Sequence, residues 1–184
     1  MARSLMSLVL LGAVAVAVAG CGVTRLSRSW SEPHAARSFW AYAGAGKPFL
    51  VEARNLPPAV TAEGLAAAFP APPTVAPPAR YTVAPADAAY PEYRFVLLFG
   101  APAGVDGADA CADRAPVLKG GETLQAAFCH RERVLAEVRG EAVAAAFAQG
   151  AASPAARALL YDVVRHLVPP PEAEVRDLPD PPPL

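Results

Sequence analysis

The sequence has few lysines and histidines, and its positive and negative charges nearly balance. Among its 184 residues there are only two lysines and three histidines, isoleucine is absent, and the formal net charge is −1. A protein that binds nucleic acid needs a basic face, so this charge balance argues against that class. His34, His130 and His166 are scattered, and neither Cys-x-x-Cys nor His-Glu-x-x-His occurs. We therefore expect no metal and no cofactor.

The chain is rich in alanine, proline and arginine instead. It has 43 alanines, 21 prolines and 14 arginines, so the hydrophobic fraction of 54% overstates the surface that folding can bury. The reason is that an alanine side chain is a single methyl group. The length allows one domain with extended ends.

Residues 1–20 have the pattern of an export signal. Arg3 is the only charge before Cys21, and the residues from Leu5 to Ala19 are apolar or small. A helix of this apolar stretch spans about 22 Å, which is short of the ~30 Å hydrocarbon core of a bilayer. A cleaved signal segment is therefore favoured over a permanent membrane span.

The signal segment ends in Val18-Ala19-Gly20-Cys21, an aliphatic residue and two small residues before a cysteine. This pattern resembles the lipobox of bacterial lipoproteins. The resemblance implies that Cys21 receives a diacylglyceryl group, that cleavage occurs before it, and that the new amine is acylated. Two or three acyl chains hold a protein firmly on a membrane. The alternatives are an ordinary signal peptide with a chance cysteine, or an uncleaved anchor.

The same resemblance implies a lipid-anchored protein of the cell envelope that faces the periplasm. Gly22 follows the cysteine. In the enterobacterial sorting scheme an aspartate at that place retains a lipoprotein in the inner membrane, so glycine favours the outer membrane. The composition is similar to that of small proteobacterial envelope lipoproteins. This resemblance assigns no activity to any residue of the chain.

The two other cysteines predict a disulfide. If Cys21 carries lipid, Cys111 and Cys129 remain as a pair in an oxidising compartment. A disulfide between them would close a loop of about 19 residues and add roughly 3 kcal/mol of stability. A metal or redox pair is the alternative, but no spacing supports it.

The mature chain divides into three parts. We expect residues 21–37 to form a polar, lipidated tether and residues 38–168 to form one α+β domain. Residues 169–184 are acidic and rich in proline, so we expect them to be disordered or extended. Aromatic residues near the start of the domain either pack on its core or lie at the membrane interface; they are Trp30, Phe39, Trp40 and Tyr42.

Hydrophobic periodicity predicts a mainly antiparallel sheet of four or five strands, a C-terminal helix on one face and a second short helix. Strands are expected at 48–54, 80–83 and 92–99, and both faces of the last are apolar, as in a central strand. Helices are expected at 62–69 and 154–168, with Thr61 and Ser153 as N-caps. Residues 100–116 read as a loop.

Residues 123–129 and 133–139 predict a hairpin. Its apolar faces coincide if Phe128 lies opposite Val134, which requires a loop of three or five residues centred on Arg131. Cys129 would then face away from Phe128, and Cys111 would approach it from that side. The many charges of the hairpin indicate a strand edge that is exposed to solvent. The alternative is that this edge binds a partner protein.

No pattern indicates catalysis. Asp106, Asp109 and Asp113 lack the alternating oxygens of a calcium loop and read as a solvated turn. Asp162 and His166 are four apart on the last helix, where a surface ion pair is expected. Residues 44–47, Gly-Ala-Gly-Lys, resemble a phosphate loop only faintly and read as a turn.

We therefore expect a lipoprotein that is held on the membrane by lipid on Cys21 and has a non-catalytic structural or protein-interaction role. Its expected partner is an envelope protein. The alternative is a periplasmic module that binds a small ligand or envelope polymer between sheet and helix. Its expected wall residues are Tyr81, Tyr90, Tyr93 and Phe95. A hydrolase ranks third, because no nucleophile has a recognisable setting.

Overall fold

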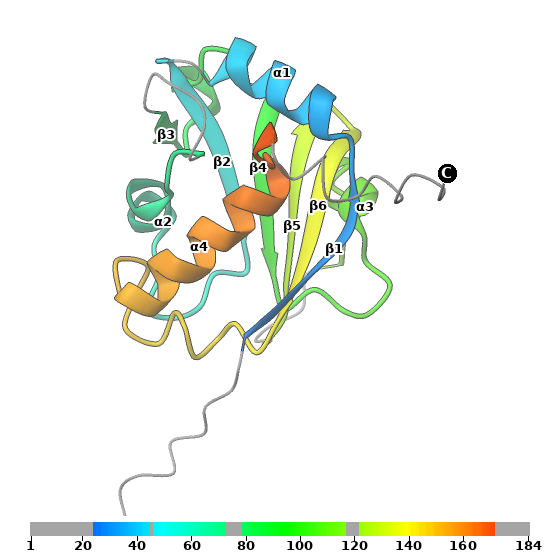
Figure 1. Cartoon of the computed structure of the whole chain (residues 1–184). Coiled ribbons are helices and arrows are strands. Elements are labelled where there is room, and N and C mark those ends of the chain that lie inside the picture. The colour runs from blue at the N-terminus through cyan, green and yellow to red at the C-terminus, as the bar shows by residue number, and fades with distance from the viewer. Residues whose placement is uncertain (1–23, 45, 73–78, 117–121, 172–184) are drawn as a thin grey trace, which may run out of the picture.

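The computed structural model describes residues 24–44, 46–72, 79–116 and 122–171. These residues form a six-stranded sheet in the order β1-β6-β5-β4-β2-β3 (Figure 1). The strands are β1 (Arg25–Ser31), β2 (Pro48–Arg54), β3 (Arg80–Thr82), β4 (Tyr93–Phe99), β5 (Leu124–His130) and β6 (Arg133–Glu141). The helices are α1 (Pro33–Ala43), α2 (Ala62–Ala68), α3 (Gly107–Cys111) and α4 (Pro154–Leu167), with a 3-10 turn, η1, at Pro85–Asp87.

The sheet is mixed. The pairs β1·β6, β6·β5 and β5·β4 are antiparallel, whereas β4·β2 and β2·β3 are parallel. The predicted α+β class and the C-terminal helix are confirmed. The expectation of four or five mainly antiparallel strands is wrong in two respects. The sheet has six strands, and the strands β4, β2 and β3 at one end are parallel to one another. Parallel neighbours need a crossover connection, and the segment with α2 supplies one between β2 and β3.

The predicted tether over 21–37 is wrong from Arg25 onward. Arg25–Ser31 is an edge strand on β6, with Arg25 opposite Glu141, and α1 begins at Pro33. The start of β1 alternates as a half-buried strand does, because Leu26 packs against the core between the exposed Arg25 and Ser27. Only three residues lie between Cys21 and Arg25, and Cys21 itself is outside the described residues.

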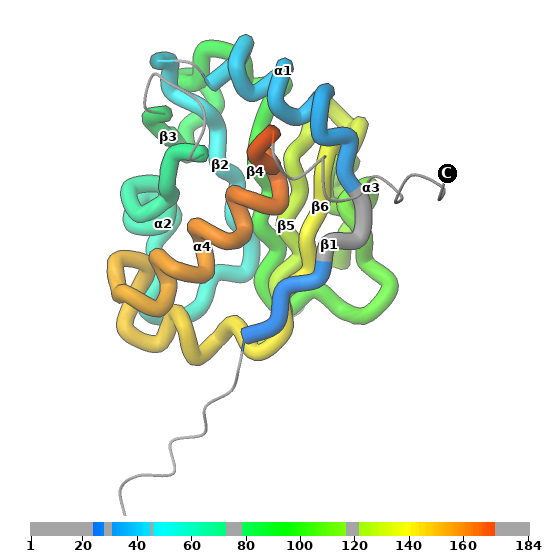
Figure 2. Tube along the Cα trace, viewed as in Figure 1, coloured from blue at the N-terminus to red at the C-terminus, as the bar shows by residue number. Residues whose placement is uncertain are grey.

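The main core lies between the sheet and the helices α1, α2 and α4 (Figures 1 and 2). Trp40 of α1 is 1% exposed and stacks on Phe95 of β4 with ring centroids 5.4 Å apart. The helix α4 buries one apolar stripe against the sheet; it includes Ala156, Leu160, Val163, Val164 and Leu167. Thr61 and Ser153 cap α2 and α4 as expected, each accepting a backbone N–H through its hydroxyl oxygen.

A second, smaller core lies on the other face of the sheet, beneath α3. It joins Val96 and Leu98 of β4 to Ala110 and Cys111 of α3. The predicted central strand is thus confirmed, since β4 is buried on both faces. The loop expected over 100–116 contains this helix, which is only five residues long and too short to show a helical period in the sequence.

The hairpin register differs from the prediction. Phe128 pairs with Ala136 rather than Val134, and His130 pairs with Arg133 across a two-residue turn. The register shifts between Phe128 and Cys129. This bulge restores the parity that a two-residue turn would otherwise lose, so Ala136 and Val138 share the main-core face with Phe128, whereas Val134 packs against the second core. Cys129 does point away from Phe128, as expected, because the two side chains belong to different cores.

Candidate functional site

The predicted disulfide pair is found under α3. Cys111 and Cys129 are joined with their Cα atoms 5.5 Å apart, and neither residue is more than 1% exposed. The bond ties the last residue of α3 to the central strand β5. Its place in a closed apolar core supports a structural role.

Arg94 adds a polar clamp beside this disulfide. Its guanidinium donates to the Cys111 carbonyl at 2.7 Å and to the Arg131 carbonyl at 3.0 Å. Its Nε donates to Glu52 Oε2 at 3.0 Å. Sequence reasoning missed this role, because one arginine in an apolar strand looks like a solvent-facing interruption.

Glu137 is a buried carboxylate, not part of a solvated edge. It is 7% exposed and accepts hydrogen bonds from the Gly107 backbone N–H and from Gln125 Nε2. The prediction that the hairpin forms a solvated, charged edge is wrong for Glu137. The strand β1 pairs with β6, so β6 lies inside the sheet. The hydrogen bond from Gly107 attaches the start of α3 to β6.

The aspartates of the 106–113 segment have structural partners. Asp106 Oδ1 accepts the Asp109 backbone N–H at 2.9 Å and caps α3. Asp113 forms an ion pair with Arg54. Among the described residues no group of three or more acidic, histidine or cysteine side chains is arranged to hold a metal ion. Asp162 is exposed on α4 and His166 is half-buried there.

The residues expected to line a ligand pocket mostly lie in the core. Phe95 is fully buried with Trp40 stacked on its ring, and Tyr93 is 7% exposed. Tyr81 donates its hydroxyl to the Pro70 carbonyl at 2.8 Å, and burial raises the pKa of Tyr81 above its usual range. Tyr90 belongs to a different, more exposed group.

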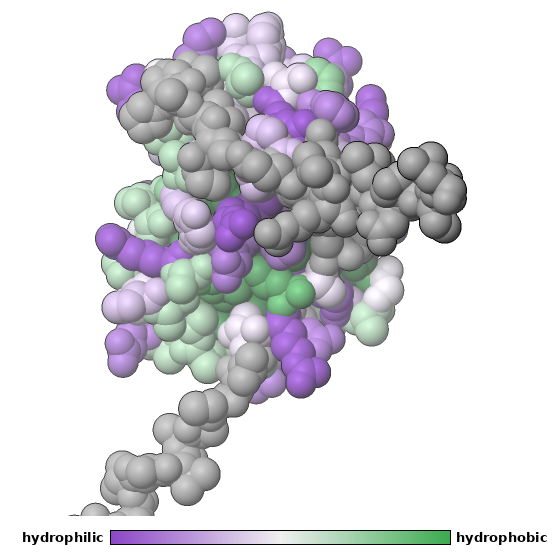
Figure 3. Space-filling view, in the orientation of Figure 1, coloured by the Kyte–Doolittle hydropathy of each residue, from purple (hydrophilic) through white to green (hydrophobic). Residues whose placement is uncertain are grey.

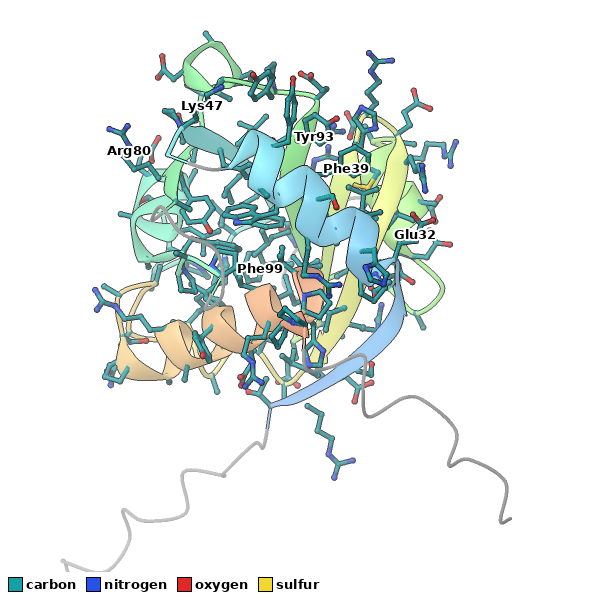
Figure 4. All side chains as sticks on the ribbon, turned by 45° about the horizontal axis from the view of Figure 1, so that its top comes forward. Glu32, Phe39, Lys47, Arg80, Tyr93 and Phe99 are labelled. Carbon is teal, nitrogen blue, oxygen red and sulfur yellow. A yellow bond between two sulfur atoms is a disulfide. The ribbon has the colours of Figure 1, made fainter. Side chains whose placement is uncertain are left out.

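That group is a cluster of rings at the end of the sheet beneath α1, which we call the aromatic cluster: Phe39, Tyr42, Tyr90, Tyr93 and His130. Tyr42 is its most open member, 57% exposed. Tyr93 stacks on His130 with centroids 4.5 Å apart, and Phe39 lies 5.3 Å from Tyr93. Figure 4 shows Phe39, Tyr93 and Lys47 at this end of the molecule, along α1.

Lys47 gives the aromatic cluster one charged side. Lys47 Nζ donates to the Tyr90 hydroxyl oxygen at 3.0 Å, and this bond lowers the pKa of Tyr90. Tyr42 lies 4.7 Å from Tyr90, ring to ring, and its hydrogen bond to Tyr90 raises the pKa of Tyr42. Lys47, the last residue of the 44–47 segment that was read as a turn, thus contacts a tyrosine. Rings with polar tips beside a cation suit a protein interface.

Two hollows lie at the opposite end of the sheet. One is a groove of about 330 Å³ beside Thr24, Leu26 and Leu159. The other, about 370 Å³, adjoins Asn55 and Phe99 at the carboxyl ends of the parallel strands β2 and β4. The loop after β6 contributes alanines to both.

No described helix has the length and apolar character needed to cross a bilayer. Comparison with protein-family profiles, curated proteins and solved structures gives no match for this chain. Its function is therefore inferred from its own residues and their placement.

Proposed function

We propose that this protein is a lipoprotein of the cell envelope, anchored by lipid on Cys21, facing the periplasm, with a non-catalytic protein-interaction role. The supporting observation is the Val18-Ala19-Gly20-Cys21 pattern, followed three residues later by the folded domain at Thr24. Thr24 is the first described residue and donates its hydroxyl to the Ala142 carbonyl at 3.3 Å, so the chain already belongs to the folded domain at this point. Gly22 favours sorting to the outer membrane.

The aromatic cluster is the proposed docking surface for an envelope protein. It lies at the end of the sheet away from Thr24, since His130 ends β5 next to the start of β6, whereas Arg25 pairs with Glu141 at the end of β6 (Figure 1). The nine residues of β6 separate the two ends by roughly 26 Å. Tyrosines are enriched in interface hot spots, because they bring a large contact area and a polar tip.

The anchor is tested by Cys21→Ser. This substitution should abolish palmitate incorporation and release the protein from membranes. Cys129→Ser is the matched control, because Cys129 is committed to the disulfide and should not affect labelling. A Cys21→Ser protein that stays uncut and membrane-bound would show instead that the segment from Leu5 to Ala19 is a true anchor.

The docking surface is tested by photo-crosslinking in living cells. A photoreactive amino acid replaces Tyr42, and a second protein carries it at Tyr161 of α4, the other exposed large ring in the described chain. Position 42 should give a discrete crosslinked protein that position 161 does not. Identical products at both positions, or none at position 42, would argue against this surface.

A ligand-binding role is the second candidate, favoured by the cavity of about 370 Å³ near Asn55 and Phe99. Its volume is within the range of small-molecule sites, and ligands often bind beyond the carboxyl ends of parallel strands. Asn55 lines this cavity, and its Nδ2 donates a hydrogen bond of 2.8 Å to the carbonyl oxygen of Phe99. A thermal-shift screen of Asn55→Ala against the wild type tests this role.

A further inference from the structure

The lipid attachment point is very close to the folded domain. Cys21 and Thr24 are three positions apart, and three extended residues span at most about 11 Å. A lipid on the Cys21 sulfur therefore keeps Thr24 near the level of the lipid head groups. This step rests on the proposed function, because it requires the lipid.

The surface around Thr24 is apolar and hollowed. The groove of about 330 Å³ beside Thr24 runs between the start of β1 and the first turns of α4, and its floor includes Leu26 and Leu159. Figure 3 shows hydrophobic side chains gathered there, just above the point where the chain enters the domain. The other lining residues are the single charged side chain of Asp162 and alanines of the loop after β6 and of α4: Ala145, Ala146, Ala155 and Ala158.

The adjoining loop carries no charge. From residue 142 to residue 156 the sequence has no aspartate, glutamate, lysine or arginine, and Ala144, Ala148 and Gln149 of this stretch are exposed. The charges that border it are of both signs, so they favour neither an anionic nor a cationic partner. They are Arg25, Glu122, Glu141, Arg157 and Asp162.

We propose that this end of the domain, formed by Thr24, the 142–153 loop and the groove, rests on the lipid bilayer that holds the Cys21 anchor. A short link makes the contact intramolecular and gives it a high effective concentration. Weak apolar contacts are then enough to keep the face on the membrane. The aromatic cluster, at the far end of the sheet, points away from the bilayer toward its partner.

The test uses the lipidated protein in vesicles of phosphatidylethanolamine and phosphatidylglycerol that contain brominated acyl chains. A single fluorophore is placed through Ala148→Cys on the proposed face, or through Ala41→Cys on α1 as the matched control. Both alanines are exposed, and the disulfide leaves the introduced thiol as the reactive one. Bromine should quench the label at position 148 several-fold more strongly than at position 41, at low and high salt alike.

A second preparation inserts a Gly/Ser spacer of roughly 20 residues, with an r.m.s. reach of roughly 25 Å, between Gly22 and Val23. The spacer should reduce quenching at position 148 to that at position 41. Equal quenching at both positions without the spacer, or stronger quenching at position 41, overturns the proposed orientation. Palmitate labelling of the same samples separates this result from failure of the anchor, because unlabelled protein would contradict the proposed function itself.

Discussion

Arg94 donates a hydrogen bond of 2.7 Å to the carbonyl oxygen of Cys111, directly beside the disulfide that links Cys111 to β5. In the register of β4 and β5, Arg94 lies opposite Cys129. One covalent bond and one charge-assisted hydrogen bond thus fix the same end of α3 to two neighbouring strands. The core on this face of the sheet is small, so this end of α3 is attached to the sheet mainly by these two bonds.

Removal of the disulfide should weaken the fold without abolishing it. The double substitution Cys111→Ser, Cys129→Ser opens a loop with a sequence separation of 18 residues. We expect the free energy of unfolding to fall by roughly 3 kcal/mol, because the unfolded chain is no longer constrained. Urea unfolding measures this, and dithiothreitol should destabilise the wild type but leave the double variant unchanged. An effect of the reductant on both proteins would contradict the assignment.

Gly107→Ala should destabilise the attachment of α3 to β6. A Cβ atom at this position would lie 2.6 Å from Glu137 Oε2 and 2.7 Å from Val134 Cγ2. We expect a loss of about 1–3 kcal/mol in unfolding free energy, since the buried carboxylate must move away from its donors. Ala103→Ser, at an exposed site of the preceding loop, is the control and should change stability by less than about 0.5 kcal/mol.

Ala142→Gly should stabilise the protein. Ala142 has a φ of 55°, in the left-handed region that costs an alanine about 1–2 kcal/mol. Relief of this strain exceeds the extra entropy that glycine loses on folding, so we expect a net gain of up to about 1 kcal/mol. Ala127→Gly, in the buried part of β5, should instead lower stability. Thermal unfolding of the two variants gives the comparison, and a loss for Ala142→Gly would refute the strain.

Alkaline pH should destabilise the protein through Tyr81. Burial raises the pKa of Tyr81 in the folded state, whereas in the unfolded chain it titrates near 10. The contribution of Tyr81 to the free energy of unfolding is therefore fully present below about pH 10. Above that value it falls by roughly 1.4 kcal/mol per pH unit. Urea unfolding at about pH 8 and about pH 11 should show a smaller pH effect in Tyr81→Phe than in the wild type. Equal slopes would exclude Tyr81 as the cause.

Elements with strong local signals could be predicted from the sequence. The bounds of β2 were predicted correctly, because alternating Phe49 and Val51 face one core. The starts of α2 and α4 followed from Thr61 and from Ser153-Pro154, whose cap hydrogen bonds are local. The Cys111–Cys129 pair followed from the cysteine count once the lipobox resemblance had assigned Cys21 to lipid.

Features that depend on distant contacts could not be predicted. The bulge after Phe128 shifts the pairing register within the hairpin, and no residue type in the sequence indicates a bulge at that position. β1 is a strand because β6 offers an edge 112 residues away, as the antiparallel pairing of Ser27 with Arg139 shows. The aromatic cluster draws its rings from α1, the segment before β4, β4 and β5, and only the folded sheet brings these together.

The most direct test of the central claim is mass spectrometry of the N-terminal peptide of the protein extracted from membranes. Lipidation predicts that the peptide begins at Cys21, and that its mass is increased by a thioether-linked diacylglyceryl group and an amide-linked acyl chain. A peptide that begins at Met1, or one with an unmodified Cys21 thiol, would contradict the anchor and with it the proposed orientation on the bilayer.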